Sequence, residues 1–385
     1  MGDIIIEYKE TVDSDCTLPI LTSSKTEGVI LQEEHFGRKQ QHDITGYNIL
    51  PRNYCTYRNR SDGVDFTFNI NKCCDKGIIS KFYPVFSGKN SDVFFLSLVL
   101  NNSEEVVREI AYTCTGTGQK VLSFLDLQKM KVRVPNFDEQ KEIAAYFESL
   151  DHLITLHQRK CDEIKTLKKY MLQKMFPEKG KRVPEIRFDG FTEDWEQRKV
   201  TDLGEIYIGL VTTMTEHYTD QGHLLIRNSD IKDGYLEFGE NPIYLDEEFS
   251  EQNKSRMHQL GDVITVHTGD IGTSAVIGEN EVNSIGFATI VTRPNQEELD
   301  SDYFATYLNT DTHKRWAISM ATGDGRSNYN LKDYTKLVVP IPQIKEQKKI
   351  AACIGNLNNL ITLHHRKYNI NTKIKVYFSK RLGTA

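Results

Sequence analysis

The sequence predicts an α+β protein in which two similar globular domains are separated by two long antiparallel coiled-coil helices, with pseudo-twofold symmetry. Three observations support this: a long internal repeat, short β-branched runs between glycine turns, and heptad spacing of apolar residues. The chain has 385 residues, enough for two or three domains. Its 38% hydrophobic and 26% charged residues are typical of globular proteins.

The internal repeat is the strongest of these features. Residues 139–160 read EQKEIAAYFESLDHLITLHQRK and residues 346–367 read EQKKIAACIGNLNNLITLHHRK, and they share 14 of 22 residues at an offset of 207. Shorter matches precede each copy in the same order at offsets of 206 to 210: residues 20–28 with 226–234, 91–94 with 301–304, and 115–118 with 322–325. Such a period indicates a duplicated unit. Counterparts of residues 183–199 fall before Met1, so we expect the first unit to be shortened at its start.

The front part of each unit is predicted to be mixed in structure. In the second unit, residues 261–267 and 287–293 are β-branched and lie between glycine turns, which is typical of strands. A helical stretch over residues 301–320 follows, and a glycine-rich loop at 322–328 leads to an apolar run at 337–340. We therefore expect each front part to be a compact α+β domain.

The back part of each unit is predicted to be one long helix of roughly 35 to 38 residues, about 55 Å in length. Apolar residues recur at spacings of four and three, which is a heptad seam. The seam consists of Ile143, Phe147, Leu150, Ile154, His157, Cys161, Ile164, Lys168, Met171 and Met175, and of Ile350, Ile354, Leu357, Ile361, His364 and Tyr368. A flanking stripe holds Leu360, Leu363, Ile370, Ile374 and Tyr377. We expect the two helices to pack antiparallel, the first capped by Asp138.

Composition excludes several classes of protein. There are 54 acidic and 48 basic residues, a net charge of −6, so no positive field covers the whole chain and any DNA binding must be local. The longest apolar runs are too short for a membrane span, and the N-terminus resembles no secretory signal. We therefore expect a cytoplasmic protein without membrane contact, whose seven cysteines are reduced thiols.

Motifs for catalysis are weak. Residues 241–244, Asn-Pro-Ile-Tyr, resemble a methyltransferase motif but lack its second proline, and a turn is the better interpretation. Residues 115–120 lack the spacing of a phosphate-binding loop, and the charges at 162–165 fall on the outer side of the predicted helix. His157 and His364 occupy matching seam positions, where a polar pair that fixes helix register is favoured over metal binding. No catalytic, metal or cofactor site is predicted in this chain.

Equivalent loops in the two front parts are the remaining candidates for function. They are rich in Gly, Thr, Asn, Gln, Lys and Arg. Glycine allows close approach to a phosphate, and the polar side chains are of the types that pair with phosphates or base edges. An ordinary surface turn explains these loops equally well.

The repeat EQKxIAAxxxxLxxLITLHxRK, the phrase YMLQKMFP at 170–177, the opening VPEIRFDGFTEDWEQRK at 183–199 and the paired glycine loops resemble the specificity (S) subunit of type I restriction-modification systems. The resemblance covers essentially the whole chain. It implies two target-recognition domains, residues 1–137 and 178–342, a central spacer helix at 138–177, and a distal spacer helix with the C-terminal end at 343–385. The last stretch, residues 373–385, departs from the family by not repeating the MLQKMFP ending.

The resemblance also implies a function and partners. Each recognition domain is expected to read one half of a bipartite sequence in double-stranded DNA. Two methyltransferase (M) subunits are expected to bind S-adenosylmethionine, and restriction/motor (R) subunits to use ATP and Mg, while this chain is non-catalytic. The alternatives are a stand-alone DNA methyltransferase or nuclease, and a coiled-coil scaffold without DNA specificity.

The matched segments supply the candidate DNA-contacting residues. In the first domain they are Thr22, Ser23, Ser24, Lys25, Tyr57, Arg58, Thr115, Thr117, Gln119 and Lys120. In the second they are Arg227, Asn228, Ser229, Asp230, His267, Thr268, Arg326, Ser327 and Asn328.

Overall fold

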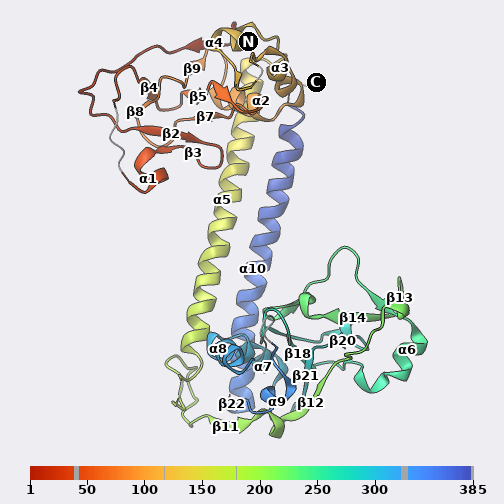
Figure 1. Cartoon of the computed structure of the whole chain (residues 1–385). Coiled ribbons are helices and arrows are strands. Elements are labelled where there is room, and N and C mark those ends of the chain that lie inside the picture. The colour runs from red at the N-terminus through yellow and green to blue at the C-terminus, as the bar shows by residue number, and fades with distance from the viewer. Residues whose placement is uncertain (39–42, 117, 179, 322–327, 383–385) are drawn as a thin grey trace. The chain divides into compact units, whose positions relative to one another are not determined.

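The computed structural model describes residues 1–38, 43–116, 118–178, 180–321 and 328–382 (Figure 1). It forms two compact units: unit 1 comprises Met1–Gln158 with Arg366–Ala385, and unit 2 comprises Arg159–His365. Each unit contains a globular α+β part and a portion of both long helices, α5 (Phe137–Lys174) and α10 (Ile344–Ser379). Unit 1 is therefore built from two separate stretches of the chain.

The globular part of unit 1 consists of short strands and four short helices, one of which lies between β3 and β4. Its strands are β1 (Ile5–Glu7), β2 (Leu21–Ser24), β3 (Gly28–Leu31), β4 (Asn48–Pro51), β5 (Cys55–Tyr57), β6 (Arg60–Ser61), β7 (Phe68–Ile70), β8 (Lys76–Ile79), β9 (Val85–Gly88) and β10 (Lys120–Val121). Its helices are α1 (Gln32–Phe36), α2 (Val93–Asn102), α3 (Glu104–Thr113) and α4 (Phe124–Lys129).

The globular part of unit 2 has a similar order of elements. Its strands are β11 (Glu196–Lys199), β12 (Gly204–Ile208), β13 (Tyr218–Thr219), β14 (His223–Arg227), β15 (Ile231–Lys232), β16 (Tyr235–Leu236), β17 (Tyr244–Leu245), β18 (Val263–Thr265), β19 (Ser274–Val276), β20 (Ile285–Phe287), β21 (Ile290–Pro294) and β22 (Val338–Ile341). Its helices are α6 (Glu247–Gln252), α7 (Ser301–Leu308), α8 (Asp311–Met320) and α9 (Leu331–Tyr334).

The central sheets of the two units have the same topology. The strand order is β1-β9-β5-β7 in unit 1 and β12-β21-β18-β19 in unit 2, and every pairing in both is antiparallel. The register also corresponds, because Cys55 pairs with Phe86 and Val263 pairs with Thr292, at offsets of 208 and 206. The duplication inferred from the sequence therefore extends to the fold.

The helix pair after each sheet is capped in the same way. Asp92 accepts a hydrogen bond from the Phe95 amide at the start of α2, and Asp300 accepts one from Tyr303 at the start of α7. The stretch 301–320 was predicted to be helical, and it forms two helices, because α7 ends at Leu308 and Thr310 caps α8.

Aromatic residues dominate both cores. In unit 1, Tyr57 and Phe68 lie 4.7 Å apart between ring centroids and are fully buried. In unit 2, Trp195 and Tyr303 are packed around Phe176, which follows α5. The end of α5 is thereby fixed to the core of unit 2.

The heptad seam is confirmed by burial. All sixteen seam positions named from the sequence are buried or half-buried. On the flanking stripe, Ile374 is half-buried, whereas Leu360, Leu363, Ile370 and Tyr377 are 43–56% exposed.

The long helices run antiparallel within each unit (Figure 1). In unit 1, Asp151 forms an ion pair with Lys375, and Phe147, four residues earlier on α5, lines a pocket with Phe378. In unit 2, the Cys161 thiol contacts the Ile361 carbonyl, and the later residues Met171 and Met175 pack in one core with Ile350. In both units, later residues of α5 thus contact earlier residues of α10, as two antiparallel helices require.

One capping prediction was wrong. Helix α5 begins at Phe137, one residue before the predicted cap Asp138. The Asn136 side chain accepts hydrogen bonds from the amides of Asp138 and Glu139, both at 3.1 Å. Asn136 therefore caps the helix. Asp138 lies in the first turn, where its negative charge interacts favourably with the helix dipole.

Candidate DNA interface

Asn228 connects two loop segments with the end of a strand in unit 2. Its side-chain oxygen accepts a hydrogen bond from the His267 amide at 2.8 Å. Its amide nitrogen donates to the carbonyls of Phe287 and Ala288, at 3.3 and 3.2 Å. Asn228 directly follows β14, so the end of this strand is held against the segment that follows β18.

His267, Thr268 and Asn328 form a hydrogen-bonded chain beside Asn228. The Thr268 hydroxyl donates to the Asn328 side-chain oxygen at 2.8 Å, so it must accept from His267 Nδ1, which lies 2.8 Å away. Partial burial lowers the pKa of His267 and favours the neutral ring. A neutral ring that donates through Nδ1 presents Nε2 as an acceptor, which suits the exocyclic amino groups of adenine and cytosine.

Three of the segments chosen from the sequence therefore meet in unit 2. Thr268 and Asn328 also form a β-bridge, and the Tyr329 amide donates to the His267 carbonyl at 2.9 Å. Thr117, Arg326 and Ser327, which the sequence also suggested as DNA contacts, lie outside the described residues. Asn328 is at the point where the described chain resumes after the glycine-rich loop.

Asp230 has a structural role instead of the predicted contact role. It is 4% exposed and accepts hydrogen bonds from the backbone amide and the guanidinium of Arg227. The Asp230 carboxylate raises the pKa of Arg227 and holds its guanidinium in place. Arg227 remains partly exposed and Ser229 is exposed, so these two side chains stay available at the surface.

Phe287 and Ala288 are part of this cluster and were missed from the sequence. Phe287 was predicted to begin a strand, but it ends β20 and its side chain is 40% exposed. Ala288 has a φ of 49°, a left-handed conformation that is costly for a residue with a Cβ. The Asn228 amide holds this strained turn in place, and nothing in the local sequence pattern signals it.

In unit 1, the hairpin between β2 and β3 carries the predicted residues Thr22 to Lys25. Asn69 on β7 donates to the Ser23 hydroxyl and to the Ser24 carbonyl, both at 2.8 Å. The Lys25 ammonium lies 2.6 Å from the Asp65 carboxylate, and both side chains are about two-thirds exposed. The structure thus joins this hairpin to the loop that precedes β7.

The glycine-containing loop of unit 1 meets the segment after β5. Lys120 pairs with Ser61 between β10 and β6, and Thr115 forms a bridge with Val121. The Gln119 amide lies 3.5 Å from the Asp62 carboxylate. The pairing of Ser61 with Lys120 corresponds to the bridge between Thr268 and Asn328 in unit 2. The offset is 207 from Ser61 to Thr268 and 208 from Lys120 to Asn328.

Tyr57 is not a surface residue, which corrects its prediction as a DNA contact. Its side chain is fully buried and its hydroxyl donates to the Leu122 carbonyl at 3.1 Å. Arg58, the next residue, is exposed. The true counterparts of His267 and Thr268 are Arg60 and Ser61, which a uniform offset of 207 would have found where the offset of 210 gave residues 57 and 58.

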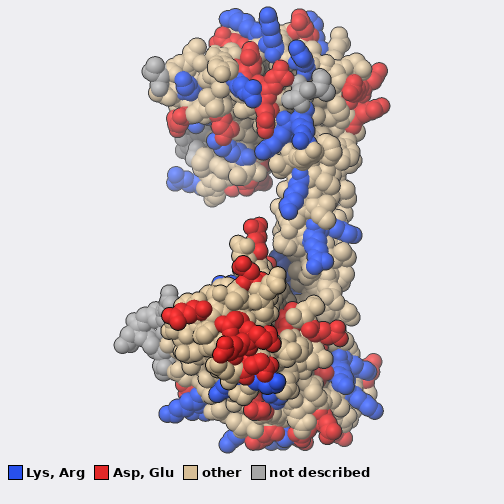
Figure 2. All heavy atoms as spheres, turned by 90° about the vertical axis from the view of Figure 1, so that its right-hand side faces the viewer, with Lys and Arg blue, Asp and Glu red and all other residues tan. Residues whose placement is uncertain are grey.

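Charge distinguishes the faces of unit 2. Figure 2 shows acidic side chains gathered on the face where α6 lies, and this helix carries Glu247, Glu248 and Glu251. Such a face repels phosphates. The surface of α6 is therefore poorly suited to meet DNA.

The motifs considered for catalysis are explained by local structure. Tyr244, from the Asn-Pro-Ile-Tyr motif, begins β17, which pairs with β13 and β14. Glu163 forms exposed ion pairs with Arg159 and Lys160 on the surface of α5. Across the described ranges, no group of three or more His, Cys, Asp or Glu side chains is arranged to hold a metal ion. Among the described helices, none is both long and apolar enough to span a membrane.

A family model described as "Type I restriction modification DNA specificity domain" matches residues 13–166 and 192–372. The chain belongs to this family. The first match begins after β1 and extends into α5, and the second begins just before β11 and extends into α10.

Curated relatives are similar to the chain at low identity. The specificity subunit of the type I restriction enzyme MjaVIII from Methanocaldococcus jannaschii is 21% identical over 304 residues, 76% of this chain and 70% of the relative. The specificity subunit of EcoBI from Escherichia coli is 22% identical over 254 residues, 62% of this chain and 53% of the relative. The matched part therefore spans between about half and two-thirds of these relatives.

Solved structures share the fold. The crystal structure of a type I restriction-modification S subunit from M. genitalium covers 99% of this chain and 94% of its own, with a TM-score of 0.59 and 12% identity. A second structure, from work on complex assembly and conformational transition of the type I system, covers 92% of this chain and 85% of its own, with a TM-score of 0.51 and 14% identity. The family's α+β architecture with long helices is thus the fold of this chain.

Proposed function

We propose that the chain is the DNA-recognition subunit of a type I restriction-modification complex and that each unit reads one half of a bipartite DNA target. The two family regions, one in each unit, support two readers on one chain. We assign residues 1–137 and 178–342 to the recognition domains, 138–177 to the central spacer helix, and 343–385 to the distal spacer helix and C-terminal end.

One observation carries this proposal. In both units, the end of a glycine-containing loop pairs with the segment that follows an inner strand of the sheet. In unit 1, Lys120 pairs with Ser61 after β5, and in unit 2, Asn328 pairs with Thr268 after β18. Each pairing brings together polar side chains that are exposed or partly exposed, among them Ser61 and Lys120 in unit 1 and Thr268 and Asn328 in unit 2. Such groups suit readout in the major groove, where all four base-pair orientations can be distinguished.

The long helices are proposed to fix the gap between the two half-sites. α5 has 38 residues and α10 has 36, and each contributes to both units. A paired antiparallel seam resists bending and changes of register. The length of the helices would then determine the number of unread base pairs.

Catalysis is assigned to partner chains. We propose that two methyltransferase (M) subunits bind S-adenosylmethionine and modify the target, and that restriction/motor (R) subunits use ATP and Mg. The net charge of −6 fits this division, because other subunits can supply much of the charge that binds phosphates. The complex is proposed to work in the cytoplasm on double-stranded DNA.

Methylome sequencing tests the proposal. The chain is co-expressed with its cognate M subunit, and methylation is expected at a motif of two short sequences separated by a fixed gap. A single continuous motif, or no methylation with a soluble complex, would contradict it.

Single substitutions then assign each half-site. Asn328→Ala should relax one half of the motif, because it removes the acceptor that positions the Thr268 hydroxyl. Arg60→Ala should relax the other half, because a pair of bonds from one arginine to a base contributes about 1–3 kcal/mol of discrimination. Lys332→Ala, on the exposed surface of α9, is the control and should leave the motif unchanged. Relaxation of both halves by one substitution would refute separate readers.

A further inference from the structure

Residues 185–199 cover one side of the paired helices in unit 2. The Ile186 amide donates to the Lys174 carbonyl at 2.9 Å, and the Arg187 guanidinium binds both oxygens of Glu346 at 2.7 and 2.9 Å. Lys349 lies 5.9 Å from the ring centre of Phe188 and 5.1 Å from that of Phe191. Ile186 and Phe188 pack against the core that contains Met175 and Ile350.

The same segment then completes a small sheet. Its last part is β11, Glu196–Lys199, which pairs antiparallel with β22, Val338–Ile341. Trp195, directly before β11, is 1% exposed in the core of unit 2. Residues 185–199 therefore cover an apolar surface and also add the strand β11 to the edge of β22.

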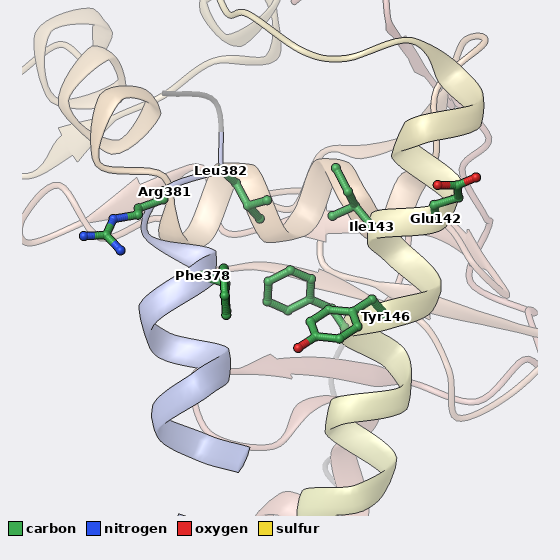
Figure 3. Close-up of a pocket in the computed structure, with 7 residues that line it drawn as sticks. Glu142, Ile143, Tyr146, Phe378, Arg381 and Leu382 are labelled. Atoms are coloured by element: carbon green, nitrogen blue, oxygen red, sulfur yellow. The ribbon is translucent and has the colours of Figure 1, made fainter. Parts of the chain in front are cut away.

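Unit 1 has a pocket of about 400 Å³ at the corresponding place on its helices. Figure 3 shows that Ile143 and Tyr146 from α5 face Phe378 and Leu382 from the α10 side, with Glu142 and Arg381 at the ends of the row. The exposed fractions of Tyr146 and Phe378 are both 49%. The pocket is thus largely apolar and open to solvent.

The walls of this pocket are the counterparts of the residues under the covering segment in unit 2. At an offset of 207, Glu142, Ile143 and Tyr146 correspond to Lys349, Ile350 and Cys353. At the same offset, Phe378, Arg381 and Leu382 correspond to Met171, Lys174 and Met175. In unit 2, Lys174 and Lys349 contact the segment directly, and Ile350 and Met175 belong to the core on which it packs.

The strand edge has a counterpart as well. Residues 131–134 correspond to β22, and Val132 and Val134 are half-buried while Lys131 and Arg133 are exposed. This alternation is typical of a strand with one buried face. Yet the structure assigns no strand to residues 131–134, whereas β22 is paired with β11.

We propose that the pocket and the adjacent edge of unit 1 bind an extended segment of another polypeptide, with the pattern aliphatic-Arg-Phe-x-Gly-Phe followed by a tryptophan and a short strand. Strand addition supplies backbone hydrogen bonds, and the pocket supplies specificity. This site is separate from the proposed DNA interface and does not depend on it.

Charge complementarity supports an arginine at the second position of the pattern. Glu139 corresponds to Glu346, the partner of Arg187 in unit 2, and it is exposed in unit 1. Glu142 takes the place of Lys349, so a second carboxylate stands at the site. The arginine of the incoming segment would meet Glu139 as Arg187 meets Glu346.

A labelled peptide with the sequence of residues 183–199 tests the proposal by fluorescence anisotropy with the full chain. Saturable binding in a one-to-one ratio is expected. Tyr146→Arg should weaken binding at least about tenfold, because it places a charge in the apolar pocket. The matched control is Tyr170→Arg, on the same helix and 48% exposed, which should bind normally. Unchanged helicity of both variants in circular dichroism shows that they remain folded.

A charge exchange gives a second, independent readout. Glu139→Arg should weaken binding of the original peptide. A second peptide, in which the residue equivalent to Arg187 is glutamate, should bind this variant more tightly than it binds the unchanged chain. Absence of saturable binding would overturn the proposal. Binding that survives Tyr146→Arg would also overturn it, since the peptide would then lie elsewhere.

Discussion

Arg187 and Glu346 show how a single residue pair fixes the opening of unit 2 to a long helix. The Glu346 side chain has no exposed surface, and that of Arg187 is 13% exposed. Both residues stand in motifs that the sequence analysis singled out, but their pairing could not be predicted, because they are 159 positions apart and either could have been a solvated surface charge.

Replacing Arg187 with alanine should destabilise unit 2 by about 3 kcal/mol, because it leaves the Glu346 carboxylate buried without its cation. Urea denaturation followed by circular dichroism measures the change. Arg198→Ala is the control, since its pair with Glu298 is more exposed and should contribute about 1 kcal/mol or less. Equal effects of the two substitutions would show that burial of the Arg187 pair is unimportant.

Two buried histidines make the stability of unit 2 depend on pH. Burial lowers the pKa of both His258 and His313 to about 4, so both rings are neutral in the folded protein near neutral pH. In the unfolded chain they take up a proton below about pH 6.5. The unfolded state therefore binds more protons between these values, and stability falls as the pH is lowered through this window.

The free energy of unfolding should drop by about 2 kcal/mol for each of these histidines between pH 7 and pH 5. Denaturant titrations at pH 8, 7, 6 and 5 measure it, and the values at pH 8 and 7 should agree closely. A constant free energy down to pH 5 would show that the rings are already charged in the fold or are reached by water.

At the scale of single elements, the long helices were the most predictable part of the molecule and the candidate site the least. The seam repeats over many turns, so an error at one residue does not change the prediction. Short strands and loops lack such redundancy. Tyr57 carried an aromatic ring suited to a binding surface, yet tertiary packing placed it in the core, and the cluster at Asn228 depends on a strained turn at Ala288.

The seam of α5 can be tested with two leucines of one helix. Leu150 is 6% exposed and packs with Phe147 and Leu98, whereas Leu153 is 39% exposed. Leu150→Ala should cost about 2–4 kcal/mol because it opens a cavity. Leu153→Ala should cost less than about 1 kcal/mol. Thermal or denaturant unfolding of both variants decides this, and a larger loss for Leu153 would mean that the seam faces another way.

For the whole molecule, the duplication was visible in the sequence, because 14 of 22 aligned residues in the long helices are identical. The globular parts have diverged much further, but they keep one sheet order and equivalent helix caps. The two parts thus share packing and topology, while their loop residues differ from one another. The family could therefore be inferred from the sequence, and the individual contacts could not.

Inserting seven residues into both α5 and α10, after Gln158 and His365, should lengthen the gap in the recognised motif by about three base pairs. Seven helical residues span about 10.5 Å, and base pairs rise about 3.4 Å. Methylome sequencing should show both half-sites unchanged. The insertion in α5 alone is the control and should abolish activity by misaligning the seam. Altered half-sites with an unchanged gap would contradict the spacing role.

The division of unit 1 into two stretches has a consequence for biosynthesis. Unit 2 is continuous in the chain, whereas unit 1 ends with residues 366–385. At translation rates of about 5–20 residues per second, the 207 residues of unit 2 take about 10 to 40 s to emerge. Unit 1, whose globular part leaves the ribosome first, cannot be completed until its last helical turns have been made. Unit 2 can therefore be completed before unit 1.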